Sequence, residues 1–199
     1  MKQNNIKIAI TGGIGSGKST VASIISDMGY PVYSCDKIYE NLLTDLELIR
    51  SVTEEFGDVL TQGCIDKNKI AVSVFADERK LKKLNEITHP IIMRKVIDLM
   101  SCHEISFCEV PLLFEGGYEK LFDYVIVVLR DMEDRIQSVA ERDKLSTESV
   151  LNRIKTQLDY SNSDFAQYYV IHNTANINVL VEKTREILNK ISVCIGRRL

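Results

Sequence analysis

The sequence lacks the features that mark metal-stabilised, disulfide-stabilised or membrane-spanning proteins. Its five cysteines are odd in number and include no C-x-x-C pair, which argues against a zinc site and a disulfide framework. No stretch approaches the roughly 18 apolar residues of a membrane span, and the apolar run near the N-terminus is too short for a signal-peptide core. The net charge of −3 provides no general basic surface for nucleic acid. We therefore expect a soluble, cytoplasmic protein with reduced thiols and with no nucleic-acid or membrane partner. The sequence carries no signal for an oligomeric state.

What the sequence does contain is a glycine-rich octapeptide at residues 12–19, Gly-Gly-Ile-Gly-Ser-Gly-Lys-Ser. It fits the phosphate-binding P-loop pattern G-x-x-x-x-G-K-[ST]. Glycines allow positive φ values and bring backbone N–H groups close to phosphate oxygens. Lys18 can reach the β- and γ-phosphates, and Ser19 can place a hydroxyl on Mg²⁺. A β-branched run precedes the loop, and an apolar helical stripe follows it as far as Gly29, so the motif has its required context rather than that of a plain glycine-rich turn.

The apolar segments alternate between strand-like and helix-like patterns. Strands are predicted at Ile6–Thr11, Pro31–Cys35, Ile105–Val110, Asp123–Leu129 and Tyr168–His172. A helical stripe in the last helix comprises Leu180, Thr184, Ile187, Leu188 and Ile191. Alternating strands and helices predict an α/β fold, a five-stranded parallel sheet flanked by helices and wound by right-handed crossovers.

Two long intervals between strands are predicted to be insertions within a single domain. Residues 37–104 read as a mainly helical lobe, in which Asp66 and Asp77 look like N-caps and Pro90 fits the first turn of a helix. Residues 131–160 read as a basic helical lid over phosphates, the alternative being an exposed helix pair with i,i+4 ion pairs. The remaining core would comprise residues 1–36, 105–130 and 161–199.

A P-loop alone leaves GTPases, ATPases and small-molecule kinases open. The guanine-reading N-K-x-D motif is absent, and no D-x-x-G switch follows the third predicted strand, so the pattern favours a small-molecule kinase. Such an enzyme needs a base for the acceptor hydroxyl, placed where a strand beside the P-loop ends. Asp36 comes directly after the second predicted strand and is the leading candidate; alternatively it caps the following helix.

Several segments together resemble the dephospho-coenzyme A kinase family. They are the P-loop with its flanks from Thr11 to Thr20, Ser34-Cys35-Asp36, Thr88-His89-Pro90, Val110-Pro111-Leu112-Leu113-Phe114-Glu115, the lid residues Arg135, Arg142-Asp143, Arg153-Ile154 and Gln157, and Val170-Ile171 followed by Asn173. The matches run from residue 6 to about residue 180. The resemblance implies a P-loop kinase that transfers the γ-phosphoryl of ATP to the ribose 3′-hydroxyl of dephospho-CoA with Mg²⁺ as cofactor, the last step of CoA synthesis.

The resemblance also implies roles for individual residues. Asp36, Lys18 and Arg142 would be catalytic, as base, phosphoryl-binding cation and stabiliser of the equatorial oxygens. The nucleotide would be bound by Gly13, Gly15, Ser16, Gly17, Lys18, Ser19, Thr20, Arg153 and Asn173. The acceptor would contact His89, Leu113 and Phe114, and the metal would contact Ser19.

Some positions depart from the family pattern or allow two interpretations. Ser34 replaces the usual first acid, Glu40 lies where the family has Arg or His, and Ala175 replaces a common glycine. Glu109 is either a Walker B-like acid near Mg²⁺ or a polar strand end. His89 is either an acceptor contact or a structural residue at a helix entry, and Cys35 is interpreted as a packing residue rather than a nucleophile.

Overall fold

The computed structural model describes residues 5–74, 77–174 and 176–196, and the chain forms two compact units. The core unit comprises Met1–Tyr33 and Met100–Leu199, and the helical unit comprises Ser34–Leu99. Residue 175, one of the departures noted above, lies outside the described residues. Within the described ranges, no helix is both long enough and apolar enough to cross a membrane.

The core unit is built on the predicted five-stranded sheet, which is confirmed. Its strands are β1 (Ile6–Thr11), β2 (Val32–Ser34), β5 (Ile105–Glu109), β6 (Tyr124–Leu129) and β7 (Tyr169–His172). The strand order is β2-β5-β1-β6-β7, and β1 pairs in parallel with both β5 and β6. Because the strands are parallel, their carboxyl ends meet at one edge of the sheet, where open α/β sheets bind ligands.

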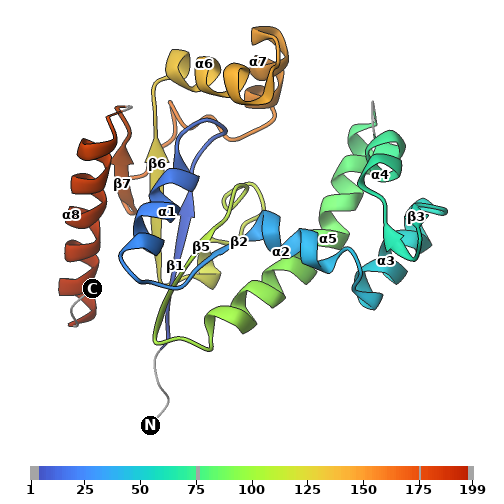
Figure 1. Cartoon of the computed structure of the whole chain (residues 1–199), viewed down its shortest axis with the longest axis horizontal. Helices are drawn as coiled ribbons and strands as arrows, with labels where there is room; N and C mark the ends of the chain where they lie inside the picture. Colours follow the sequence, from blue (N-terminus) through green and yellow to red (C-terminus); the bar gives the residue numbers. More distant parts are fainter. Residues whose placement is uncertain (1–4, 75–76, 175, 197–199) are drawn as a thin grey trace. The chain divides into compact units, whose positions relative to one another are not determined.

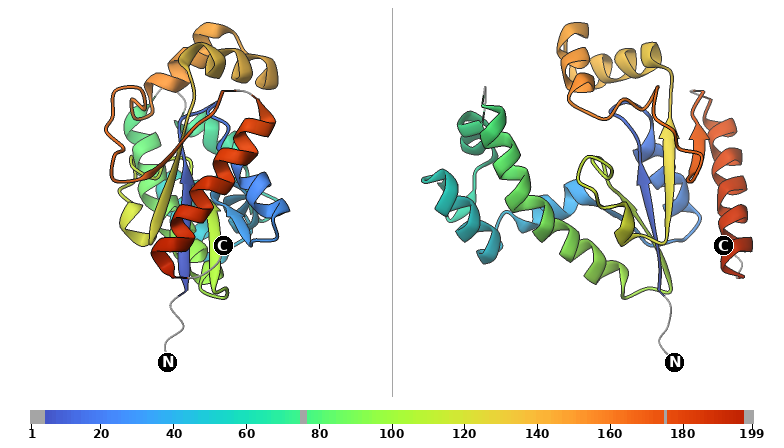
Figure 2. Two further views of the ribbon diagram at one scale, coloured as in Figure 1. Left: turned by 90° about the vertical axis from the view of Figure 1, so that its left-hand side faces the viewer. Right: turned by 180° about the vertical axis from the view of Figure 1, so that it is seen from behind.

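Helices connect and cover these strands. They are α1 (Lys18–Asp27), α6 (Met132–Asp143), α7 (Thr147–Lys155), α8 (Ile177–Ile195) and the short 3₁₀ helix η1 (Glu119–Leu121). The pair α6 and α7 lies beyond the carboxyl end of β6, at the same edge as the loop between β1 and α1 (Figures 1 and 2). We call residues 131–160 the lid segment.

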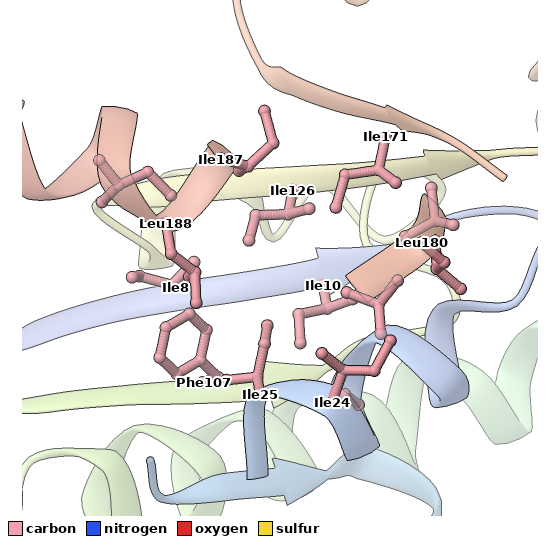
Figure 3. Close-up of a cluster of buried hydrophobic side chains, with 14 residues drawn as sticks. Ile8, Ile10, Ile24, Ile25, Phe107, Ile126, Ile171, Leu180, Ile187 and Leu188 are labelled. Atoms are coloured by element: carbon pink, nitrogen blue, oxygen red, sulfur yellow. The ribbon is translucent and has the colours of Figure 1, made fainter. Parts of the chain in front are cut away.

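The main apolar core of this unit lies between the sheet and the helices α1 and α8 (Figure 3). The strand residues Ile8, Ile10 and Ile126 are fully buried there, together with Phe107. The predicted stripe of α8 is confirmed, because all five of its members are buried. Burying side chains of this size stabilises the fold by about 1.5–3 kcal/mol each, so this packing fixes the sheet that carries the P-loop.

The helical unit contains more than the helices predicted for it. Its elements are α2 (Cys35–Leu42), α3 (Leu46–Phe56), β3 (Leu60–Thr61), β4 (Cys64–Ile65), α4 (Lys67–Val74) and α5 (Glu78–Met100), which runs on into the core unit. The hairpin of β3 and β4 was not predicted. Its two-residue loop has positive φ at both Gln62 (52°) and Gly63 (80°), the pattern of a type I′ turn.

The predicted caps in this unit are confirmed, but the predicted helix start at Pro90 is wrong. Asp66 and Asp77 each accept two backbone N–H groups of the first turn that follows them. The helix capped by Asp77 is α5, so Pro90 lies deep inside it. A proline inside a helix removes one backbone hydrogen bond, and here that loss does not end the helix.

Candidate functional site

The loop between β1 and α1 forms a concave row of backbone N–H groups. Its φ values are positive at Gly15 (77°) and Gly17 (94°), whereas the intervening Ser16 is not among the residues with positive φ. The N–H of Ser16 closes a turn by donating to the carbonyl of Gly13 at 3.1 Å. Alternation of this kind makes an anion-binding nest, and the N-terminus of α1, which follows Gly17, adds its positive dipole end.

The outer side of this loop is held by side chains from the end of β6, from α6 and from the loop after β7. Arg135 Nε donates to the carbonyl of Ile14 at 2.9 Å, and Asn173 Nδ2 donates to that of Ser16 at 2.9 Å. Arg130 Nη1 lies 3.5 Å from the carbonyl between them, that of Gly15. In a trans peptide the C=O and N–H groups point in opposite directions, so outward carbonyls direct the following N–H groups inward.

This close packing explains why glycines stand in the loop. A Cβ on Gly13 would lie 2.4 Å from Arg135 Nη2, and a Cβ on Gly17 would lie 2.3 Å from Asn173 Nδ2. Asn173 was predicted to contact the nucleotide. In this structure it is buried and holds the backbone of the loop that would bind the phosphates.

The segment that follows α7 is attached to the same loop. Gln157 Oε1 accepts the N–H of Ile14 at 2.7 Å, and the hydroxyls of Tyr160 and Thr11 lie 3.5 Å apart. Burial raises the pKa of Tyr160 to about 12, despite the opposing effect of the Thr11 hydroxyl, so the phenol stays neutral at physiological pH. Sequence reasoning placed Gln157 in the lid pattern but gave it no function, and it missed Tyr160.

A cavity of about 410 Å³ opens beside the loop within the core unit. The lining residues that bear on its chemistry are Gly13, Ser16, Arg130, Arg135, Tyr160 and Asn173. Among the side chains that the structure describes, Ser16 Oγ and Arg135 Nη2 are buried polar atoms without a hydrogen-bond partner, whereas Arg130 Nε lies 3.6 Å from a carboxylate oxygen of Asp134. Buried polar atoms are rarely left unpaired, so this wall is suited to a polar ligand.

An acid at the end of the neighbouring strand contacts the P-loop serine. Glu109 is the last residue of β5, and its Oε1 accepts the Ser19 hydroxyl at 2.6 Å. Hydroxyl and carboxylate oxygens are ligands that Mg²⁺ accepts, which favours the Walker B-like interpretation of Glu109 over that of a polar strand end. Over residues 5–74, 77–174 and 176–196, no three His, Cys, Asp or Glu side chains gather as a self-contained metal site.

The two predicted lid cations lie together at the tip of the lid. Arg142 at the end of α6 binds Asp143 through Nε at 2.7 Å and Nη2 at 3.1 Å, and Arg153 Nη1 of α7 lies 3.3 Å from the same carboxylate. The hydrogen bond from Arg142 is the largest cause that lowers the pKa of Asp143; desolvation opposes it, and the charges of Arg142 and Arg153 add to the lowering. The structure thus brings the two arginines to one carboxylate, and their contacts with phosphate stay a prediction.

The proposed base lies in the first turn of α2. The helix begins at Cys35 with Ser34 at the N-cap position, so the alternative of Asp36 as the N-cap is wrong. Asp36 is exposed, and its carboxylate lies where the helix dipole favours a negative charge. Cys35 is buried, in line with its packing interpretation.

Other predicted acceptor-side residues occupy varied surroundings. His89 lies inside α5 instead of at a helix entry, and burial lowers its pKa. Glu40, the charge reversal noted above, pairs with Lys67 Nζ at 2.9 Å. In the core unit Leu113 is fully buried, so its side chain faces the interior, whereas Phe114 is half-buried.

Phe114 belongs to an aromatic cluster with the segment after α7. Its ring centroid lies 5.4 Å from that of Phe165 and 5.1 Å from that of Tyr168. Its neighbour Glu115 accepts the N–H of Leu158 at 2.9 Å. The V-P-L-L-F-E segment is therefore fastened to the same stretch of chain that reaches the P-loop.

Comparison with known proteins gives a consistent result. The sequence profile of the dephospho-CoA kinase family matches residues 6–178. A dephospho-CoA kinase of Fusobacterium nucleatum is 34% identical over 188 residues, which cover 92% of this chain and 97% of that protein. A dephospho-CoA kinase of Helicobacter pylori is 31% identical over 191 residues, covering 92% and 96%.

Solved structures agree with the sequence matches. The crystal structure of TT1252 from Thermus thermophilus superposes with a TM-score of 0.76 at 33% identity, covering 94% of this chain and 97% of that one. The dephospho-CoA kinase of Campylobacter jejuni gives a TM-score of 0.62 at 26% identity, covering 93% and 96%. A shikimate kinase from Acinetobacter baumannii shares the fold, with a TM-score of 0.58 at 14% identity over 95% of this chain and 94% of that one.

Proposed function

The chain belongs to the dephospho-CoA kinase family, and from this membership we propose how its own residues divide the work of the reaction. Enzymes of this family phosphorylate dephospho-CoA with ATP in the final step of CoA biosynthesis. The γ-phosphoryl group passes to the ribose 3′-hydroxyl: an O–P bond forms there, and the bond from the γ-phosphorus to the β,γ-bridging oxygen breaks. The products are CoA and ADP.

The donor half of the site is proposed to lie on the P-loop and in the cavity beside it. The N–H groups of residues 15–17, which follow the outward carbonyls, would hold the phosphates together with those of residues 18–20, and Lys18 at the start of α1 would neutralise the β- and γ-oxygens. The unpartnered atoms Ser16 Oγ and Arg135 Nη2 support a polar ligand in this cavity. The volume of about 410 Å³ lies within the range of small-molecule sites.

The metal is proposed to be Mg²⁺, held by the Ser19 hydroxyl with Glu109 beside it. When bound, Mg²⁺ would neutralise charge on the phosphate oxygens. The hydrogen bond between the two side chains keeps the hydroxyl of Ser19 oriented at the end of β5.

On the acceptor side, Asp36 is proposed to accept the proton of the 3′-hydroxyl. Asp36 follows Ser34, the last residue of β2, by two positions along the chain. The N-terminal dipole of α2 favours the charged carboxylate that a base requires. We propose that the helical unit, including His89, holds the rest of the acceptor, with Phe114 from the core unit.

We propose that cations of the lid stabilise the negative charge that develops on the transferring group. Arg142 would bind the equatorial oxygens and Arg153 the nucleotide, which requires both guanidinium groups to leave Asp143. A cytoplasmic location is proposed as well. None of the five cysteines, all within described ranges, forms a disulfide, as is usual in a reducing compartment.

The observation that carries the proposal is the nest of inward N–H groups beside a cavity with unpartnered polar atoms. Its direct test mixes the purified protein with Mg-ATP and dephospho-CoA and follows ADP release. We expect turnover that depends on dephospho-CoA and that is not supported by shikimate or gluconate. Equal background hydrolysis with and without dephospho-CoA would reject the proposed function.

The role of Asp36 is tested by Asp36→Asn, which keeps the shape of the side chain and removes its basicity. We expect kcat to fall by roughly 10²–10⁴, the range for loss of a general base, with ATP affinity nearly unchanged. Glu78→Gln is the matched control, because Glu78 is an exposed acid in the first turn of another helix, α5. Wild-type turnover in Asp36→Asn would remove Asp36 as the base.

A further inference from the structure

The backbone of Ile14 is held by two side chains from opposite ends of the lid segment. Gln157, just after α7, accepts the Ile14 N–H at 2.7 Å, and Arg135, in α6, donates to the Ile14 carbonyl at 2.9 Å. Both contacts are partly buried, so water competes with them less than at an open surface. Ile14, whose backbone both side chains hold, is the second residue of the turn in the P-loop.

That turn is one whose central peptide group can face either way. It runs from Gly13 to Ser16, is closed by the 3.1 Å hydrogen bond between them, and has Gly15 with φ 77° at its third position, as a type II turn requires. Types I and II differ in the orientation of the central peptide, and glycine at the third position allows both. The orientation decides whether the Gly15 N–H faces the phosphates or the protein.

The two side chains fix adjacent peptide groups of this turn. Arg135 holds the central one, between Ile14 and Gly15, through its carbonyl oxygen. Gln157 holds the preceding one, between Gly13 and Ile14, through its N–H. Arg135 is 3% exposed and already confined by packing, whereas Gln157 is only half-buried and is joined to the loop through its amide oxygen. Gln157 is thus the contact whose loss would leave the surrounding packing least changed.

We propose that Gln157 is a positioning residue for phosphoryl transfer, which sets the Gly13–Ile14 peptide so that the loop presents its N–H groups to the phosphates before the nucleotide arrives. It acts through the backbone of the loop and does not need to contact ATP. Donors that are oriented in advance need no rearrangement when charge develops on the transferring group. This inference rests on the donor site proposed above.

The test compares Gln157→Met with Gln137→Met. Methionine keeps the length of the side chain and removes the acceptor oxygen. Gln137 is the matched control, because it is an exposed glutamine of α6 whose Nε2 donates to Glu141 within the same helix at 2.9 Å. Calorimetry with ADP and with adenosine, which lacks phosphates, gives the affinities, and kcat and KM for ATP are measured with dephospho-CoA.

For Gln157→Met we expect the affinity for ADP and kcat/KM for ATP each to fall roughly tenfold, the effect of about one hydrogen bond, with adenosine affinity unchanged. Gln137→Met should match the wild type in all of these. Hydrogen exchange of the Ile14 amide should be faster in Gln157→Met and should stay slow in Gln157→Glu, which retains an acceptor oxygen.

Three results would overturn the inference, and they can be told apart. Wild-type ADP affinity and turnover in Gln157→Met would show that the contact has no positioning effect. Equal losses for adenosine and ADP would show a general collapse of the cavity. Failure of the wild-type protein itself to bind ADP would reject the donor site, and with it the premise of the inference.

Discussion

The base of the nucleotide site and the tip of the lid hold their polar groups in opposite ways. At the base, the side chains of Arg130, Arg135 and Asn173 are largely buried and reach carbonyl groups of the P-loop. At the tip, the side chains of Arg142 and Arg153 are 62% and 53% exposed and share one carboxylate, that of Asp143.

The difference shows which part of the site is set in advance and which part can change partners. A buried hydrogen bond that loses its partner leaves a polar group unsatisfied at a cost of about 1–3 kcal/mol, so the loop keeps its contacts. An exposed ion pair contributes about 0–1 kcal/mol, so a phosphate can replace the carboxylate at little cost. In the proposed function, the amides would thus be in place before the nucleotide arrives, whereas the arginines would be supplied afterwards.

The largest effect should come from removing the cation of the P-loop itself, Lys18. Lys18→Ala should weaken ATP binding and reduce kcat by at least roughly 10²–10³, because the positive charge that stabilises the transferred phosphoryl oxygens is lost. ADP release with dephospho-CoA measures this, and Lys80→Ala, an exposed lysine in the first turn of α5, is the control. Unaltered kinetics would contradict the assignment of residues 12–19 as a phosphate-binding loop.

A smaller effect, on the free energy of unfolding, is expected when alanine replaces Gly17 in the P-loop. A second glycine separates the contribution of backbone strain from that of packing. Gly17 and Gly29 have the same φ of 94°, so alanine strains the backbone similarly at both. At Gly17 the new Cβ would also lie 2.3 Å from Asn173 Nδ2, whereas at Gly29 no described atom beyond the glycine and its two chain neighbours lies within 4 Å of it. We expect Gly17→Ala to lower the free energy of unfolding by about 1–3 kcal/mol more than Gly29→Ala, as overpacking does. Urea denaturation of both variants measures it, and equal losses would show that Asn173 does not confine the loop.

The smallest effect should come from the tip. Asp143→Asn should leave the free energy of unfolding nearly unchanged, and it should lower KM for ATP by up to roughly fivefold, because the arginines no longer have to leave a carboxylate. The pKa of Asp143 is lowered, so its pairing is complete above the ordinary pKa of an aspartate and is lost only as the pH falls through the lower folded value.

The pH dependence and a control make this prediction specific. The effect of Asp143→Asn should be the same across pH 6–9, where the carboxylate stays charged. Glu148→Gln, which changes an exposed acid in the first turn of α7, should leave KM for ATP unchanged. A raised KM in Asp143→Asn would mean that the carboxylate helps to orient the arginines toward the nucleotide.

The fold could be predicted where one local pattern dominates. The five strands were located to within a residue at each end. A sheet covered by helices on both faces needs strands that are apolar almost throughout, and β-branched apolar runs mark such strands in the sequence. Pro90 was misplaced because proline is typical of first helical turns, whereas the real start was already marked by Asp77. The hairpin at residues 60–65 is only two residues long in each strand, too short for an alternating pattern, and the Gln62-Gly63 pair was its one available signal.

The site was predictable only in its local part. The P-loop is contiguous, so its spacing alone indicates phosphate binding. The residues that hold it come from far along the chain: Arg135 and Gln157 contact Ile14 across 121 and 143 positions. No periodic pattern reports such contacts, and the family resemblance points to the nucleotide for Asn173, whereas its described hydrogen bond is to the loop backbone.

The bonds that hold Ile14 bear on how the P-loop motif is written. Gln157 and Arg135 recognise the main chain of this residue, and its side chain takes part in neither hydrogen bond. The letter x in G-x-x-x-x-G-K-S therefore stands here for a position at which the main chain forms the hydrogen bonds, whatever its side chain. A reporter attached at position 14, or an isotope label in its carbonyl group, could follow the loop through the catalytic cycle while leaving intact the contacts that shape it.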